Sequence, residues 1–198
     1  MDKSRTYFAH WKKLKEYLVT FDANGGEGGW SNWMYIGYPI TAPEVTFGGY
    51  TFGGWFPDVD EVVPDHNVTY VAQWDSNVYR VTFMANGGTV STRAKLVEHN
   101  AEIGGLPTPE RTGYESRGWW TDAEGGTQIS SSTKITSNKT YYAHWTINQY
   151  TATFDSNGGT GGTSKTQNYG TSLSAPTVMK TGYNFVGWQP EVPTTMPA

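Results

Sequence analysis

The chain carries one short sequence pattern three times, and this repetition limits the folds that are open to it. The opening block of the pattern begins at Tyr17, Tyr79 and Tyr150, and each copy ends in Asn-Gly-Gly. A copy is long enough to be a small domain and too long to be one turn of a solenoid. The sequence therefore predicts three small domains rather than one large core. Enzymes seldom need their chemistry in triplicate, whereas stalks and binding arrays often do, so we expect no catalytic activity.

Two further blocks recur in the same order. One reads Gly-Tyr and ends in Gly-Trp, and the other reads Thr-Tyr, then Ala one residue later, and ends in Trp. A small domain has little surface to bury, and large aromatic side chains compensate for this. We therefore expect the recurring aromatic residues to form the core of each copy; they are Phe21, Tyr50, Trp55, Trp74, Phe83, Tyr114, Trp119, Trp145, Phe154, Tyr183 and Trp188.

The blocks also predict how the chain is divided. Residues 17–74 and 79–145 are two complete modules, and residues 150–198 are a third module that lacks its final strand. Residues 1–11 match the last strand of a preceding repeat. Two explanations are open: the chain is a piece of a longer array, or the segment Thr6 to Trp11 of one molecule completes the third module of another, which would give head-to-tail assembly.

The opening block has the period of a half-buried strand. Tyr79, Val81 and Phe83 alternate with Arg80 and Thr82, so the first three are expected to face the core and the other two to face outward. The Asn-Gly-Gly sequence that follows favours positive φ and predicts a tight turn.

The other two blocks also read as strands. Tyr70, Ala72 and Trp74 share one face of the closing strand, as their counterparts do in the second copy. In the middle block, Tyr50 and Trp55 are an odd number of residues apart, and the glycine before the Trp indicates a β-bulge. Segments such as 165–176 suit a short strand followed by at most a short helix. The linkers, residues 75–78 and 146–149, are too short for free motion, so an elongated, semi-rigid string is expected.

Composition excludes several classes of protein. The chain has no cysteine, so it has neither disulfides nor thiolate metal sites. A net charge of -4 with scattered Lys and Arg is not typical of a nucleic-acid-binding surface. No apolar run is long enough to span a membrane, so direct membrane insertion is not expected.

These motifs resemble the Listeria–Bacteroides repeat, the family that includes the B-repeats of internalins. The resemblance is carried by the segments 155–159, 169–171, 111–114 and 140–145, which read Asp-Ser-Asn-Gly-Gly, Tyr-Gly-Thr, Arg-Thr-Gly-Tyr and Thr-Tyr-Tyr-Ala-His-Trp. It implies a β-rich α+β fold: tandem small β-grasp-like modules with mostly antiparallel or mixed sheets and at most a short helix each. It also implies an extracellular place on a bacterial cell surface, between adhesive domains and the cell wall.

The sequence departs from the family pattern at a few positions. Met84 replaces the turn Asp, Ser116 replaces a Phe, and the first copy has Ile36 to Pro39 in place of Tyr-Gly-Thr. These departures argue against a ligand site that all copies share, but not against the common fold.

Potential metal and catalytic residues have simpler explanations. The Asp-x-Asn-Gly-Gly turn offers too few oxygen ligands for calcium. His10 and His144 occupy the same place in the closing block, but Gln73 stands there in the other copy, so solvent-facing strand positions are favoured. Asp58, Asp60, Glu61 and Asp65 read as a solvated loop rather than a hydrolase pair. Asn67 and Asn138 match the glycosylation acceptor, which recurs because the repeat does. We predict no catalytic residue, metal site or cofactor.

Aromatic residues that do not recur are the candidate binding residues. They are Trp30, Trp33, Tyr35 and Trp120. Exposed Trp and Tyr favour recognition because they give a large contact area at low entropy cost; the alternative is local packing over a longer loop. The leading hypothesis is a spacer, stalk or adhesion array of a bacterial surface or secreted protein. The alternative is a module that binds a host or cell-surface glycan or protein through these aromatic residues.

Overall fold

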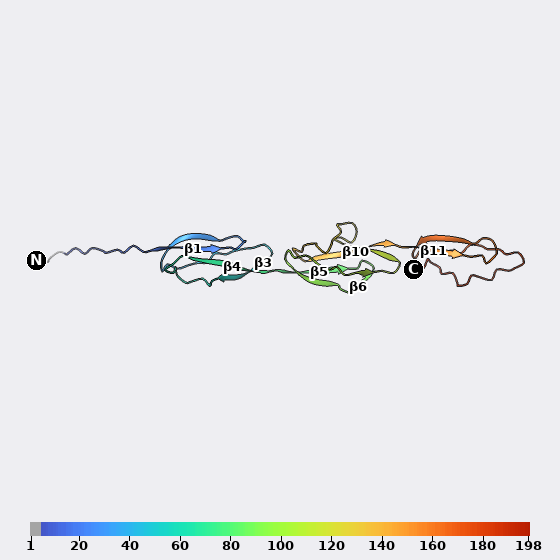
Figure 1. The fold of residues 1–198 in the computed structure, drawn as a ribbon, viewed down its shortest axis with the longest axis horizontal. Helices are drawn as coiled ribbons and strands as arrows, with labels where there is room; N and C mark the ends of the chain where they lie inside the picture. Colours follow the sequence, from blue (N-terminus) through green and yellow to red (C-terminus); the bar gives the residue numbers. More distant parts are fainter. Residues whose placement is uncertain (1–4) are drawn as a thin grey trace. The chain divides into compact units, whose positions relative to one another are not determined.

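The computed structural model describes residues 5–198, and every regular element in that part of the chain is a β-strand (Figure 1). None of the described residues belongs to a helix that could cross a membrane. The strands are β1 (Glu16–Asp22), β2 (Trp30–Tyr35), β3 (Tyr50–Phe56), β4 (Val68–Ser76), β5 (Val78–Met84), β6 (Thr89–Val90), β7 (Ala94–Glu98), β8 (Pro109–Glu110), β9 (Tyr114–Trp120), β10 (Lys139–Ile147), β11 (Gln149–Phe154) and β12 (Thr163–Asn168).

The prediction of a β-rich fold is confirmed, whereas the helix that the family resemblance allows is absent from residues 5–198. In the first copy the connection from β2 to β3 is irregular. This segment contains Gly37, Pro39 and Pro43. Glycine and proline are the two residues least favourable in a helix interior, and proline also removes a backbone donor. The connection therefore has no means of forming a helix.

We refer to residues 17–74, 79–145 and 150–198 as modules 1, 2 and 3. Module 1 has a four-stranded sheet in the order β2-β1-β4-β3, and module 2 has one in the order β7-β5-β10-β9. In both, the first and last strands lie side by side at the centre and run parallel, and the outer strands β2, β3 and β9 pair antiparallel to them. Module 3 has only the antiparallel pair β11-β12. The expected mixed and antiparallel sheets are thus observed.

The core of module 1 forms where the two central strands meet. Phe21 on β1 lies opposite Tyr70 on β4, and their ring centroids are 4.9 Å apart. Val19, Phe21, Tyr70 and Ala72 are all buried. The predicted alternation is confirmed in module 2. Val81 and Phe83 are buried there, whereas Arg80 is exposed.

Turn and bulge geometry follow from the residues that the sequence places there. The turn after the opening block has positive φ at two successive residues, Asn24 (49°) and Gly25 (90°), and the other two copies repeat this. The register between β3 and β4 shifts between Phe52 and Gly54, and Gly54 has a φ of 118°. Both the predicted tight turn and the predicted bulge are therefore confirmed.

Module 3 departs from the expected pattern. Its middle block, residues 183–188, forms no strand, and Tyr183 is 71% exposed although the sequence places it with the core residues. In modules 1 and 2 the middle block pairs with the closing strand. Residues 150–198 contain no closing strand, so the middle block has no backbone partner. The Tyr183 ring therefore has no closing strand to cover it.

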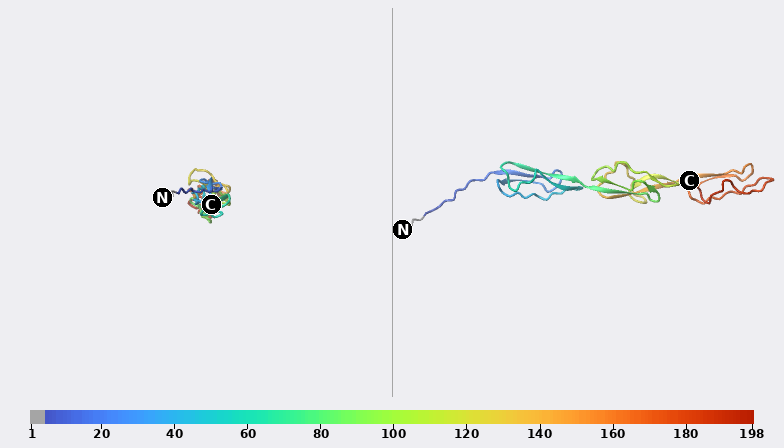
Figure 2. Two further views of the ribbon diagram at one scale, coloured as in Figure 1. Left: turned by 90° about the vertical axis from the view of Figure 1, so that its left-hand side faces the viewer. Right: turned by 90° about the horizontal axis from the view of Figure 1, so that it is seen from below.

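The segment that was expected to be a strand at residues 1–11 is not one where it is described. Residues 5–15 form no strand and run outward from β1 as a single chain (Figure 2). Residues 1–4 lie outside the described part. A lone strand has no partner for its backbone groups, so nothing in module 1 holds this segment in strand geometry.

The strands extend into the four-residue linkers, so that one residue lies between the last strand of a module and the first strand of the next. Asn77 lies between β4 and β5, and Asn148 lies between β10 and β11. The chain divides into two compact units, one ending at Val78 and the other spanning Tyr79–Ala198, so modules 2 and 3 belong to one unit.

The junction between modules 2 and 3 is held by backbone hydrogen bonds. The N–H of Asn148 donates to the carbonyl of Gly113 (2.9 Å), and the carbonyl of Asn148 accepts from the N–H of Tyr169 (2.9 Å). The ring of Tyr169 lies so close to Gly113 that a Cβ there would be 2.1 Å from it. Asn148 is therefore bonded to both modules, and the junction is a packed contact.

We expect Gly113→Ala to open this junction and Gly182→Ala to leave it intact. Both glycines have positive φ, 76° and 80°, so each substitution adds similar backbone strain, but only Gly113 has a ring against its Cα. Measured by NMR hydrogen exchange, the amides of Asn148 and Tyr169 should exchange about tenfold faster in Gly113→Ala, which corresponds to roughly 1.4 kcal/mol. Equal protection in both variants would contradict the packed junction.

Candidate functional site

The structure brings two of the four candidate aromatic residues together. Trp33 and Tyr35 are alternate residues of β2 and therefore point to the same face of the sheet, which is the face away from the core. Trp33 is 64% exposed, and Tyr35 is exposed as well. Trp30 lies on the opposite face, because it is an odd number of positions from both along the strand.

A third aromatic residue extends this surface. Tyr38 follows β2 in the chain, is exposed, and has its ring centroid 5.6 Å from that of Tyr35. We call Trp33, Tyr35 and Tyr38 the aromatic patch. Tyr38 lies in an irregular connection, where no strand alternation indicates which way a side chain faces, so the sequence alone does not predict that it joins Tyr35.

The neighbouring strand adds one apolar and one acidic side chain to the patch. In the register of β1 with β2, Leu18 lies opposite Trp33 and Glu16 lies opposite Tyr35. Hydrogen bonding to the Glu16 carboxylate, followed by its charge, raises the pKa of the Tyr35 phenol. Flat rings beside a carboxylate suit a ligand with an apolar face and hydroxyl donors, as a sugar ring has.

Trp30 is a core residue. Its ring centroid is 4.8 Å from that of Phe21, and it packs against the buried cluster of module 1. The structure therefore supports local packing, and not ligand binding, for Trp30.

Trp120 in module 2 is also packed. Its ring stacks on the imidazole of His144, with centroids 4.7 Å apart and the planes 3° from parallel. The indole nitrogen is buried and has no hydrogen-bond partner among the described residues. His144 Nε2 lies 2.9 Å from the carbonyl oxygen of Asp122. The imidazole thus contacts both the loop at Asp122 and the Trp120 ring, and it is half-buried, whereas a solvent-facing position was predicted.

The acidic loop and the histidines form no reactive cluster. Asp60 accepts a hydrogen bond from the Tyr70 hydroxyl (2.8 Å), and burial, followed by this bond, raises the pKa of Tyr70. Asp58, Glu61 and Asp65 are exposed, and so is His10. Within residues 5–198 no three His, Asp or Glu side chains are grouped so that they could hold a metal ion.

The two glycosylation-like asparagines have a structural role. Asn67 Oδ1 accepts a hydrogen bond from the backbone N–H of Leu18 (2.9 Å), and Asn138 Oδ1 accepts one from Arg80 (2.8 Å). Each therefore satisfies a donor at the start of a central strand, which explains why the residue recurs with the repeat.

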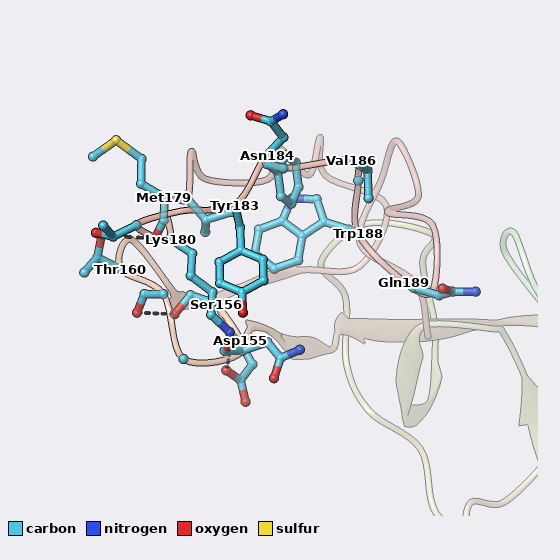
Figure 3. Close-up of a pocket in the computed structure, with 17 residues that line it drawn as sticks. Asp155, Ser156, Thr160, Met179, Lys180, Tyr183, Asn184, Val186, Trp188 and Gln189 are labelled. Atoms are coloured by element: carbon cyan, nitrogen blue, oxygen red, sulfur yellow. Dashed lines mark hydrogen bonds between the residues drawn. The ribbon is translucent and has the colours of Figure 1, made fainter.

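Module 3 contains an open groove just beyond the end of β11, between residues 155–160 and 178–189 (Figure 3). Its volume is about 1130 Å³, and we call it the module 3 groove. The Lys180 ammonium lies 4.9 Å from the centroid of the Tyr183 ring at its wall. Its lining includes Ser156, Asn157, Lys180, Tyr183, Phe185 and Trp188.

Comparison with known families agrees with this repeated architecture. The profile of the Listeria-Bacteroides repeat domain matches residues 17–73, 79–144 and 150–194. The chain belongs to this family. The match covers all three modules in tandem, as the recurring blocks predict.

Relatives over the whole chain are larger proteins. A protein of Evansella cellulosilytica named as a Gly-rich membrane protein is 31% identical over 93% of this chain and 23% of its own length. A second one from the same organism, named as a membrane protein, is 29% identical over 94% of this chain and 30% of its length. Internalin H of Listeria monocytogenes is 35% identical over 60% of this chain and 21% of its length. The chain thus spans less than a third of these relatives, and no solved structure matches it.

We expect Trp30→Ala to destabilise module 1 and Trp33→Ala to leave its stability nearly unchanged. Trp30 packs on Phe21, so its truncation should cost about 3 kcal/mol, whereas the loss of the exposed Trp33 ring should change stability by less than about 0.5 kcal/mol. Hydrogen exchange of the β1 amides measures this, because it reports on module 1 alone. A large loss of protection in Trp33→Ala would show that the patch is part of the core.

Proposed function

We propose that this chain is a non-enzymatic spacer segment of a bacterial cell-surface or secreted protein. The observation that carries the proposal is the parallel pairing of the strand where the chain enters a module with the strand where it leaves. In module 1 these are β1 and β4, and in module 2 they are β5 and β10.

This pairing determines how a module responds to tension. A pull on both ends of the chain draws the start of β5 and the end of β10 in opposite directions along the strand axis. Parallel neighbours loaded in this way must break their hydrogen bonds together, whereas an antiparallel hairpin pulled at its open end loses them one at a time. Modules 1 and 2 are thus suited to carry load between the parts of a longer protein.

The junction supports the same role. Asn148 is hydrogen-bonded to Gly113 in module 2 and to Tyr169 in module 3, so the connection is short and tied on both sides. A spacer needs this, since a flexible linker would lose the defined separation of its ends.

The relatives support a surface location. Two are named as membrane proteins and one as an internalin. We extend this to an extracellular place on the bacterial surface for this chain, and we classify the modules as β-grasp-like from their strand order, with the parallel first and last strands at the centre.

Single-molecule pulling of the 198-residue chain tests the spacer role. We expect two high-force unfolding events, from modules 1 and 2, each releasing roughly 200 to 250 Å of chain at about 3.3 to 3.6 Å per residue. Module 3 has no parallel partner beside β11 within the described residues, so it should extend at low force and serve as the internal control. Three weak events of equal force would contradict a load-bearing role.

A second candidate function is binding of a glycan through the aromatic patch. Trp33, Tyr35 and Tyr38 are exposed on one module, next to the Glu16 carboxylate. Nothing equivalent recurs in the other copies, so this function would belong to module 1 and would be added to the spacer role.

Glycan-array binding tests the patch. We expect Trp33→Ala to weaken binding at least tenfold, since buried Trp anchors in interfaces are worth about 2 kcal/mol or more. Phe56→Ala is the matched control, because Phe56 is 70% exposed and belongs to β3 at the opposite edge of the same sheet. Equal losses in both variants, or no binding by the parent chain, would remove the patch as a glycan site.

A further inference from the structure

The strand β2 forms an open edge of the complete sheet of module 1. It pairs with β1 on one side, and among the described residues no strand pairs with its other side. A free strand edge presents a row of backbone donors and acceptors, and another strand can add to it through hydrogen bonds.

The backbone of Trp33 points to this open side. Leu18 lies opposite Trp33, and its N–H donates away from β2, to the side-chain oxygen of Asn67 (2.9 Å). The two residues are therefore a pair without mutual hydrogen bonds, so the N–H and carbonyl of Trp33 face away from β1. Because the pattern alternates along an antiparallel pair, the N–H groups of Ser31 and Tyr35 face the same way.

The equivalent edge strands of the other modules carry a lysine that bonds to its own module. The ammonium of Lys165 on β12 donates to the carbonyl of Ser174 (2.7 Å). Lys95 on β7 donates in the same way to the carbonyl of Ile103. Both lysines are half-buried. Such a residue protects a sheet edge, because a strand added beside it would bury the charge.

Module 1 lacks this lysine. Asn32 lies opposite Val19 as Lys165 lies opposite Ala152, and both of these partners stand two residues before the recurring Phe. Asn32 is exposed, and β2 contains no charged residue at all. The register of β2 with β1 also runs without a bulge. Module 1 thus leaves open an edge that the other two copies protect.

The other edge of module 1 is protected in a different way. The strand β3 is also uncharged, but its register with β4 shifts between Phe52 and Gly54, and Pro57 follows the strand. A bulge bends and twists an edge so that a straight strand no longer fits beside it. The edge of module 1 that suits strand addition is therefore β2.

We propose that β2 of a second copy of this chain adds to β2 as an antiparallel strand, about a two-fold axis at Trp33. The outward backbone groups of the two Trp33 residues then bond to each other. Ser31 of each copy lies opposite Tyr35 of the other, which sets a small side chain beside a large one. The contact is isologous, so it closes as a dimer.

The side chains of β2 favour a copy of the same strand as the occupant. Trp33 is 64% exposed, and in a hydrogen-bonded antiparallel pair the two Trp33 Cα atoms lie about 5.5 Å apart, so the indole rings cover each other. Self-pairing of β2 brings no like charges together, since the strand is uncharged. The acidic residue nearest in the register, Glu16, lies on β1 and so one strand further from the second copy.

This inference goes beyond the spacer role and does not depend on it. Pulling tests the parallel strands inside modules 1 and 2, and the glycan array tests a ligand, whereas edge pairing concerns the backbone of β2. Each of the three can fail alone.

Sedimentation velocity of the 198-residue chain at concentrations up to about 1 mM tests the proposal. A contact through one six-residue strand of each copy is small, so the association is weak. We expect it to grow with concentration and to fall at least about tenfold in Trp33→Lys, which sets two like charges opposite each other.

Phe56→Lys is the matched control for charge and position. Phe56 is 70% exposed on β3, at the other edge of the same sheet, so this variant should associate like the parent. A parent chain that stays monomeric throughout, or equal losses in both variants, overturns the proposal.

Hydrogen exchange followed by NMR locates the contact. The Trp33 amide faces the open side, so its exchange should slow about threefold or more as the concentration rises from about 20 µM to 1 mM. The Met34 amide faces β1 and should be protected at every concentration, which makes it the internal reference. Association without slower exchange at Trp33 would place the contact elsewhere and would overturn the proposal.

Restoring the lysine tests why this edge is open. Asn32→Lys gives β2 the side chain that β12 carries at the same register position, so module 1 should fold as before. An added strand would bury the new charge, so association should fall at least about tenfold. Asn32→Gln is the uncharged control and should associate like the parent. Undiminished association in Asn32→Lys would count against edge pairing and overturn it.

Discussion

The parallel pairing of the first and last strands holds each complete module together. In module 1 it sets Phe21 against Tyr70 and buries Val19 and Ala72, and in module 2 it does the same with Phe83 and Tyr141. The small Ala allows the strand to lie flat against the core, and the Trp that follows donates its indole N–H to the turn after the first strand. Core, turn and sheet therefore depend on one contact between segments far apart in the sequence.

The same pairing also determines how one module is joined to the next. Because β10 of module 2 continues through Asn148 into β11 of module 3, completing the core of module 2 also fixes its junction with module 3. At Asn148 this produces two hydrogen bonds to neighbouring modules and the contact of Tyr169 with Gly113. Module 3 shows the reverse case, since without a closing strand its middle block forms no strand and its Tyr183 is exposed.

The residues that could bind a ligand differ from the residues that form the scaffold. The aromatic patch lies on the sheet face away from the core and uses residues that do not recur, whereas the residues that recur serve packing, turns or strand ends. The recurring Asn67 and Asn138 illustrate this, because each is occupied by a backbone donor of the first strand. Binding and spacing thus make independent demands on the sequence.

The sequence by itself determined the repeat, the strand alternation, the Asn-Gly turn and the bulge before Trp55, because these follow from local side-chain period and allowed φ values. It also singled out Trp30, Trp33, Tyr35 and Trp120 as aromatic residues that do not recur, because a comparison of the copies makes them visible. Only the tertiary structure decided that Trp30 and Trp120 are packed, that Tyr38 joins the patch and that Tyr183 is uncovered. These outcomes depend on which distant strand lies alongside, and such pairing has no local signature in the chain.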